Sequence, residues 1–268
     1  MARIAVAATA PFGADVLERL AARHEVTALL TRPDAPRGRG RRVGPSPARV
    51  VAERLGVPVL QPERPEPGLD LGAPVVVVCA YGLLIPESLL AERSWLNVHP
   101  SLLPRWRGAA PVERAILAGD TETGVTIHET VREVDAGPIA AQERFAIGPD
   151  DDSGAIFERS AVVAVRLLDA VLADPSPSFV PQSVDGVTYA DKIERADRLL
   201  DLGLPADELV RRVRALSPHI GARAELHERP VTIWRARVGD TGAFEPVVVQ
   251  PDGGKRMDAA AWLRGLRC

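Results

Sequence analysis

Asn97 and His99 are two polar residues at the end of a strand-like segment that starts at Trp95. Residues two apart on a strand point to the same face. An asparagine amide can donate a hydrogen bond to a developing oxyanion without changing its own charge. A histidine beside it can donate a hydrogen bond or move a proton near neutral pH. The pair could therefore support acyl transfer, although most Asn-x-His sequences in proteins have no function.

The segment after His99 is bounded by Pro100 and Pro104, so it should be a surface loop. Its centre is nevertheless apolar, with Leu102 and Leu103 following Ser101. Apolar residues in such a loop indicate either a plug into the core or the wall of a ligand pocket.

Asp135 is the third candidate, in a turn after the strand-like residues 124–131. Its sequence, Asp135-Ala136-Gly137, favours a tight turn. On spacing alone an ordinary turn aspartate is the more frequent case, and no composition rule brings Asp135 to His99. A carboxylate that did reach His99 would stabilise the imidazolium form.

The elements that position these residues alternate between strand and helix. Four consecutive valines make residues 75–79 the clearest strand, because such a run suits a strand covered on both faces. This rhythm predicts an α/β fold with an open parallel sheet and helices on both sides. Ligands in such sheets bind at the carboxyl ends of the strands, where Asn97 and His99 lie. The other predicted strands are residues 4–9, 26–31, 57–60 and 95–99, and the predicted helices are residues 14–23, 47–55 and 156–172.

A second domain follows a linker. Residues 173–184 contain three prolines and three serines, which is typical of a linker. We therefore divide the chain into a first domain of residues 1–183 and a second domain of residues 184–268. In the second domain, residues 206–216 have helical periodicity. Residues 222–226, 231–238 and 244–249 predict a small β domain.

The composition narrows the class of protein. With 268 residues, 46% of them hydrophobic, and a net charge of −3, the chain predicts a folded protein that is not a polycation. Residues 209–237, however, hold seven arginines and two glutamates, which indicates a polyanionic partner or merely a solvated basic face. Two cysteines, Cys79 and Cys268, give neither a disulfide framework nor zinc spacing. We expect a cytoplasmic protein without a membrane span.

Residues 97–111 resemble the signature of the folate-dependent formyltransferases. The resemblance spans nearly the whole chain and implies a Rossmann-like first domain followed by a smaller C-terminal β-barrel of OB-like form. It matches the catalytic set of the family to Asn97, His99 and Asp135. It also implies 10-formyltetrahydrofolate as co-substrate and no metal ion. The resemblance further includes residues 31–42, 45–47, 80–86, 119–127, 135–137, 189–193 and 214–218, and it assigns folate binding to Ser101, Leu102, Leu103 and Pro104 and to Tyr81, Gly82 and Leu83.

A basic loop indicates which molecule accepts the formyl group. Residues 32–42 contain five arginines, two glycines and two prolines, a composition that cannot form a packed core. It suits either contact with the acceptor end of an RNA or a merely solvated, flexible loop. This loop resembles that of the family members that formylate the methionyl group of initiator tRNA. The second domain would then bind tRNA, and we expect a monomer. The candidate tRNA-binding residues are Arg37, Arg39, Arg41 and Arg42 in the loop and Arg211 and Arg212 in the second domain.

Three alternatives remain open from the sequence. A relative that formylates a purine-pathway ribonucleotide would need neither the basic loop nor the second domain. A relative that formylates an amino-sugar nucleotide has a similar strand near His128 but should lack the arginine run. A non-catalytic RNA-binding relative would not need Asn97, His99 and Asp135 together. His24, His128, His219 and His227 match no catalytic position, and we predict no role for them.

Overall fold

The computed structural model describes residues 1–37 and 42–266. The chain divides into two compact units that interleave along the sequence. The first unit holds Met1–Arg107, Gly124–Arg144 and Glu158–Thr188, and the second holds Gly108–Thr123, Phe145–Phe157 and the residues from Tyr189 on. The predicted boundary between residues 183 and 184 stays a prediction.

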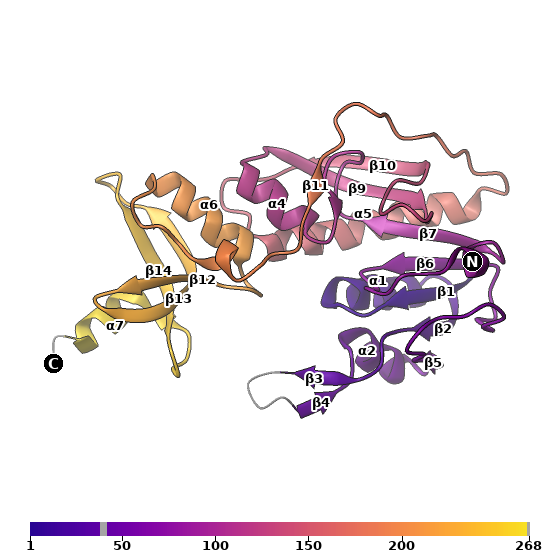
Figure 1. The fold of residues 1–268 in the computed structure, drawn as a ribbon, viewed down its shortest axis with the longest axis horizontal. Helices are drawn as coiled ribbons and strands as arrows, with labels where there is room; N and C mark the ends of the chain where they lie inside the picture. Colours follow the sequence, from indigo (N-terminus) through magenta and orange to yellow (C-terminus); the bar gives the residue numbers. More distant parts are fainter. Residues whose placement is uncertain (38–41, 267–268) are drawn as a thin grey trace. The chain divides into compact units, whose positions relative to one another are not determined.

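The first unit is built on a seven-stranded sheet of order β10-β9-β7-β6-β1-β2-β5 (Figure 1). Strands β5, β2, β1, β6 and β7 run parallel, and β9 runs antiparallel to β7. The strands are β1 (Arg3–Ala8), β2 (Glu25–Leu30), β5 (Val59–Leu60), β6 (Val75–Cys79), β7 (Ser94–His99), β9 (Glu122–Glu129) and β10 (Ile139–Ala146). The helices that pack with this sheet include α1 (Pro11–Ala21), α2 (Pro47–Leu55), α3 (Glu87–Leu90) and α5 (Ser153–Ala173).

Burial on both faces explains the valine run of β6. Val76 and Val78 belong to an apolar cluster with Trp95 on one face of the sheet. On the other side α1 packs closely, because a Cβ added to Gly13 would lie 2.3 Å from the carbonyl oxygen of Cys79. Cys79 itself is a buried free thiol, whereas Cys268 lies outside the described residues.

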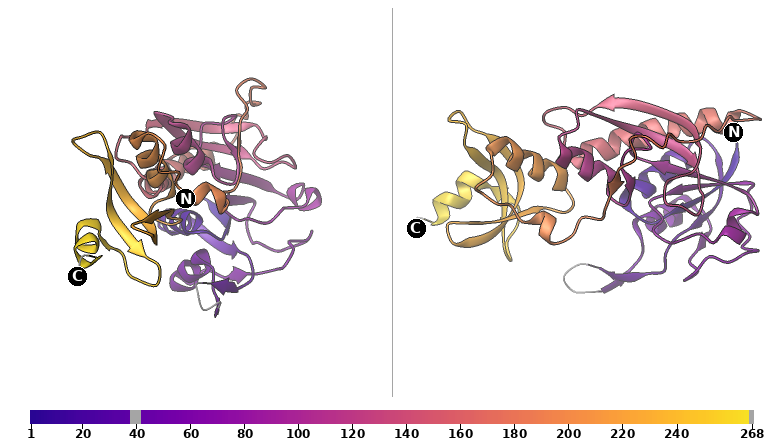
Figure 2. Two further views of the ribbon diagram at one scale, coloured as in Figure 1. Left: turned by 60° about the vertical axis from the view of Figure 1, so that its left-hand side comes forward. Right: turned by 45° about the horizontal axis from the view of Figure 1, so that its top comes forward.

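The second unit contains a four-stranded antiparallel sheet of order β12-β13-β14-β15 with helices α6 and α7 (Figure 2). Leu209, Val213 and Leu216 form the buried stripe of α6, which packs against β13. The remaining elements are β8 (Arg107–Gly108), α4 (Pro111–Ala118), β11 (Tyr189–Ala190), a 3-10 turn (Ala196–Arg198), α6 (Ala206–Leu216), β12 (Ala222–Leu226), β13 (Arg229–Val238), β14 (Phe244–Pro251), β15 (Met257–Asp258) and α7 (Ala259–Leu266).

The predicted fold class is confirmed: a mixed α/β unit with a largely parallel sheet, and a small antiparallel β unit toward the C-terminus. Two short strands, β3 (Ala35–Arg37) and β4 (Arg42–Gly44), pair antiparallel at the base of the arginine loop. Among the described residues, no helix has the length and apolar character that crossing a membrane requires.

Candidate active site

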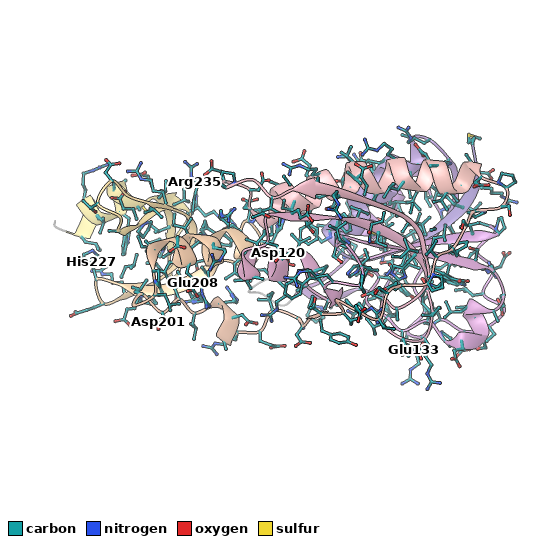
Figure 3. The ribbon with its side chains drawn as sticks, turned by 90° about the horizontal axis from the view of Figure 1, so that it is seen from above. Asp120, Glu133, Asp201, Glu208, His227 and Arg235 are labelled. Atoms are coloured by element: carbon teal, nitrogen blue, oxygen red, sulfur yellow. The ribbon has the colours of Figure 1, made fainter. Side chains whose placement is uncertain are left out.

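Four polar side chains meet at the carboxyl end of β7. Asn97 and His99 lie on β7, and the antiparallel register with β9 sets His128 directly opposite Asn97. Asp135 comes from the turn between β9 and β10 and approaches both histidines. The turn can be located in Figure 3 by Glu133, two residues before Asp135. The structure therefore brings together all three predicted catalytic residues and adds a fourth.

Both hydrogens of the Asn97 amide point at protein acceptors. Nδ2 of Asn97 lies 2.9 Å from Oδ1 of Asp135 and 3.1 Å from Nε2 of His128. A carboxylate can only accept, so the NH2 group and not the amide oxygen must face Asp135. The amide is therefore held in one orientation.

His99 is held through both ring nitrogens. Nε2 lies 2.8 Å from the carbonyl oxygen of Trp106, which can only accept, so Nε2 carries the hydrogen. In the neutral ring Nδ1 then has a lone pair, and it faces Oδ2 of Asp135 at 3.5 Å. Burial is the largest influence and lowers the pKa of His99; His128 lowers it further, while Asp135 and the Trp106 carbonyl raise it. A neutral imidazole beside a carboxylate can act as a base.

His128 has a matching arrangement. Its Nδ1 lies 2.8 Å from the carbonyl oxygen of Glu129 and therefore donates, which leaves Nε2 to accept from Asn97. The ring is buried, and its plane meets that of His99 edge-on with centroids 6.4 Å apart. From the sequence we predicted no role for His128. Only the pairing register of β7 with β9 reveals its place, and that register joins residues 31 positions apart.

The turn that carries Asp135 has unusual backbone geometry. Asp135 has φ of +50°, a left-handed conformation that costs energy for a residue with a side chain. Gly137 approaches the backbone so closely that an added Cβ would lie 1.8 Å from the carbonyl oxygen of Glu129. The predicted tight turn at Asp135 is present, and it directs the carboxylate towards β7.

Comparison with known proteins decides the family. The model for "Formyl transferase" matches residues 2–172, and the model for "Formyl transferase, C-terminal domain" matches residues 192–246. The chain belongs to the formyl transferase family. A methionyl-tRNA formyltransferase of Paracoccus denitrificans is 39% identical, over 98% of this chain and 97% of the relative. One of Xanthomonas axonopodis pv. citri is 40% identical, over 99% of this chain and 98% of the relative.

Solved structures of other proteins share the fold. HypX from Aquifex aeolicus in complex with tetrahydrofolic acid matches with a TM-score of 0.70 at 18% identity, covering 98% of this chain and 47% of HypX. Methionyl-tRNA formyltransferase from Clostridium thermocellum matches with a TM-score of 0.65 at 12% identity, covering 94% of this chain and 99% of that protein. At these identities the likeness concerns the fold alone.

In this formyl transferase, residues 101–104, which we predicted to bind folate, are held by hydrogen bonds and packing contacts within the protein itself. The Ser101 hydroxyl is buried and donates to the Arg105 carbonyl at 2.7 Å. Leu103 is 3% exposed, so it packs into the core and does not form the exposed wall of a ligand pocket. The backbone N–H of Leu103 donates to the Thr126 hydroxyl, and its carbonyl oxygen accepts from the Gln142 amide. The side chain of Leu102 packs against Gly124. Pro104 accepts a backbone hydrogen bond from Thr188. Direct contact of Ser101, Leu102, Leu103 and Pro104 with folate stays a prediction.

The loop after β6 contains Tyr81, Gly82 and Leu83. Tyr81 is 2% exposed, and its hydroxyl has no hydrogen-bond partner among the described residues. Burial raises the pKa of Tyr81 to about 12, so it stays a neutral phenol at physiological pH. Gly82 has φ of +78° beside Arg32, and Leu83 packs against the core. Leu84, by contrast, is 77% exposed.

The predicted tRNA-binding residues are only partly described. Arg39 and Arg41 lie outside the described residues, and of Arg37 and Arg42 only the paired backbone of β3 and β4 is described. Arg212 on α6 forms a salt bridge of 2.8 Å with Glu208, which Figure 3 labels. Arg211, also on α6, has a buried Nε without a hydrogen-bond partner in the described part of the chain.

Proposed function

We propose that this chain transfers the formyl group of 10-formyltetrahydrofolate to the free amino group of methionyl-tRNA. The observation that carries the proposal is the site itself: His99, whose Nδ1 faces Asp135, with the Asn97 amide beside it. Membership of the formyl transferase family supports the reaction, and relatives of about 40% identity named methionyl-tRNA formyltransferase support the acceptor.

His99 and Asp135 handle the proton in this reaction. The amine nitrogen attacks the formyl carbon, and the new C–N bond leaves the nitrogen with an excess proton. Nδ1 of His99 takes that proton, because its Nε2 already donates to the Trp106 carbonyl. The resulting imidazolium is stabilised by Asp135 at 3.5 Å. The proton then passes to N10 of the folate as the C–N bond to the leaving group breaks. General acid–base help of this kind contributes about 10²–10⁴ in rate.

Asn97 stabilises the oxyanion. Its amide hydrogens face Asp135 and His128 in the ground state. When His99 becomes protonated, the imidazolium neutralises the charge on Asp135 and weakens its attraction for the Asn97 hydrogen. The planar amide of Asn97 can then rotate as a unit and bring an N–H to the formyl oxygen as negative charge develops there. Because charge appears on this oxygen only in the transition state, the interaction raises turnover more than substrate affinity.

We infer that the loop after β6 and the turn before Asp135 hold the folate. Leu84 follows β6 and Val134 precedes Asp135, and their side chains are 77% and 64% exposed. An ion pair of 3.8 Å joins Arg132, close to Val134, with Glu87, the first residue of α3 and three residues after Leu84. Exposed apolar side chains on neighbouring loops suit the flat face of a pterin. The folate would supply the activated formyl group, and these loops would hold its ring.

An amino-sugar nucleotide is the second candidate acceptor. The strand residues Thr126, Ile127 and His128 favour it, because the sequence resembles the sugar enzymes there and His128 contacts Asn97. The arginine-rich residues 32–42 favour tRNA, since an extended phosphate chain rewards several cations at once.

The deciding experiment gives the purified chain 10-formyltetrahydrofolate labelled in the formyl carbon, with one acceptor at a time. The acceptors are methionyl initiator tRNA, a dTDP-amino sugar and a purine-pathway ribonucleotide with a free amine. We expect the label on methionyl-tRNA with a kcat/KM at least about 100-fold above the others. Preferential labelling of the sugar or the ribonucleotide would overturn the assignment of the acceptor. If no acceptor is labelled, the proposal that this chain transfers a formyl group is overturned.

A further inference from the structure

Gln182 uses every hydrogen-bonding group of its side-chain amide. Its Nε2 donates to the carbonyl oxygens of Asp135 and Gly137, each at 2.8 Å. Its Oε1 accepts from Nε and Nη2 of Arg107 at 3.1 and 2.7 Å. An amide with two donated and two accepted bonds has one orientation only. Gln182 therefore connects the turn that carries Asp135 with Arg107, at a distance of 47 residues from Asp135 along the chain.

The backbone on either side of Gln182 is also fixed. Val180 exchanges two backbone hydrogen bonds with Ile139, at 2.7 and 2.9 Å. Further along, the Thr188 hydroxyl accepts from the backbone N–H of Trp106 at 2.9 Å. The carbonyl of Trp106 is the acceptor that holds His99. Gln182 and Thr188 thus support both partners of the catalytic pair, through the Asp135 turn and the loop behind His99.

The Asp135 turn needs such support. Its φ of +50° is a conformation that surrounding structure must impose. A small movement of this turn would take Oδ2 away from Nδ1 of His99, which is already at 3.5 Å. Misplacement of a catalytic group by about 1 Å can reduce the rate about 100-fold.

We propose that Gln182 is a positioning residue that holds the Asp135 turn in line with His99 through its two bonds to backbone carbonyls, with Arg107 fixing the orientation of its amide. The proposal rests on the proposed formyl transfer for its kinetic consequences. Gln182 touches neither substrate nor reacting atoms in this role.

Two variants separate the two halves of the amide. Gln182→Met keeps the size of the side chain and removes all four hydrogen bonds. Gln182→Glu keeps acceptors for Arg107 but cannot donate to the carbonyls of Asp135 and Gly137. We expect both variants to lower kcat by about 10- to 100-fold, with the KM for the folate changed less than about threefold. Ser183→Ala is the control, because the Ser183 hydroxyl accepts from the backbone N–H of Asp185 and, within the described part of the chain, bonds nothing outside its own segment. This variant should match the wild type.

A second measurement does not depend on turnover. The groups that face His99 are Asp135, His128 and the Trp106 carbonyl. Asp135 raises the pKa of His99, so a retreat of the carboxylate must lower that pKa. In ¹³C-labelled protein without substrate, we expect the His99 titration to move to lower pH in Gln182→Met than in the wild type. The signal is assigned by its loss in His99→Gln.

The outcomes are distinct. Wild-type kcat in Gln182→Glu would overturn the proposal, because the bonds to the carbonyls would then be unnecessary. A lowered kcat in Gln182→Met with an unmoved His99 titration would also overturn it, since that pattern indicates a merely structural loss. If the wild type transfers no formyl group, the proposed function fails, yet the titration still tests whether Gln182 controls the distance between Asp135 and His99.

Discussion

Asn97 and His128 face each other across β7 and β9, with Nδ2 of Asn97 3.1 Å from Nε2 of His128. Because Nδ1 of His128 donates to the Glu129 carbonyl, only its Nε2 is free to accept. The tautomer of one buried ring therefore sets the orientation of the amide on the neighbouring strand. This relationship leads to predictions about both residues.

Replacing Asn97 with alanine should lower kcat by about 10²–10³, because one oxyanion donor is lost. KM for each substrate should change little, since charge develops only in the transition state. Steady-state kinetics with both substrates saturating measures the effect. Unchanged turnover would remove Asn97 from the mechanism.

His128→Leu should free one hydrogen of the Asn97 amide and lower kcat by about tenfold, because the amide is no longer fixed. Asn97 is the single asparagine of the chain, so labelling with ¹⁵N-asparagine gives one side-chain amide signal. We expect this signal to shift in His128→Leu and to stay in place in His219→Leu, whose histidine is exposed on the second unit. If the amide signal of Asn97 does not shift in His128→Leu, the hydrogen bond between Asn97 and His128 is contradicted.

The pH profile should follow His99. Its neutral form is the base, and burial holds its pKa below the usual 6.5, so kcat/KM should fall only below that pH. Asp135 raises the pKa of His99, so Asp135→Asn should move this acid limb to still lower pH while reducing kcat by about 10²–10⁴. A limb that moves to higher pH in Asp135→Asn would show that another group controls the profile.

The basic loop of residues 32–42 should contribute to the binding of methionyl-tRNA and not to that of the folate. Replacing Arg39 and Arg41 with alanine should raise KM for methionyl-tRNA by about tenfold or more and flatten its salt dependence, since fewer counterions are displaced. KM for the folate should not change. Arg54→Ala is the matched control, because Arg54 pairs with Glu18 on the surface of the first unit. Equal losses for both substrates would contradict the assignment of the loop to tRNA.

The contact between α1 and β6 should be sensitive to a single methyl group. Gly13→Ala places a Cβ 2.3 Å from the Cys79 carbonyl oxygen, and the required shift should cost about 1–3 kcal/mol of unfolding free energy. Gly265→Ala meets nothing within 4 Å and should not destabilise the protein. Urea unfolding of both variants measures the difference, and equal midpoints would show that α1 adjusts freely.

Local pattern predicted much of the fold. The valine run gave β6 with its observed bounds, and the apolar stripe of α6 gave that helix from Ala206 to Leu216. Helix α4 was not predicted, because its 8 residues contain little helical period to recognise. Strand β10 was missed because none of its residues is fully buried, so its sequence carries no strong apolar alternation.

The site was less accessible to sequence reasoning. Asn97 and His99 share a strand, so their common face follows from the backbone period. His128 and Gln182 reach the site through pairing with distant segments, and no local pattern encodes that pairing. Gln182 was further obscured because prolines and serines made its surroundings resemble a linker.

The bonds of residues 180–188 also bear on biosynthesis. When residues 1–172 have been synthesised, every strand of the large sheet has been made, together with Asn97, His99 and Asp135. The amide that fixes the Asp135 turn and the hydroxyl that fixes Trp106 emerge later. A nascent chain that ends at residue 172 would therefore contain the groups proposed for catalysis but lack the two side chains proposed to hold them in line.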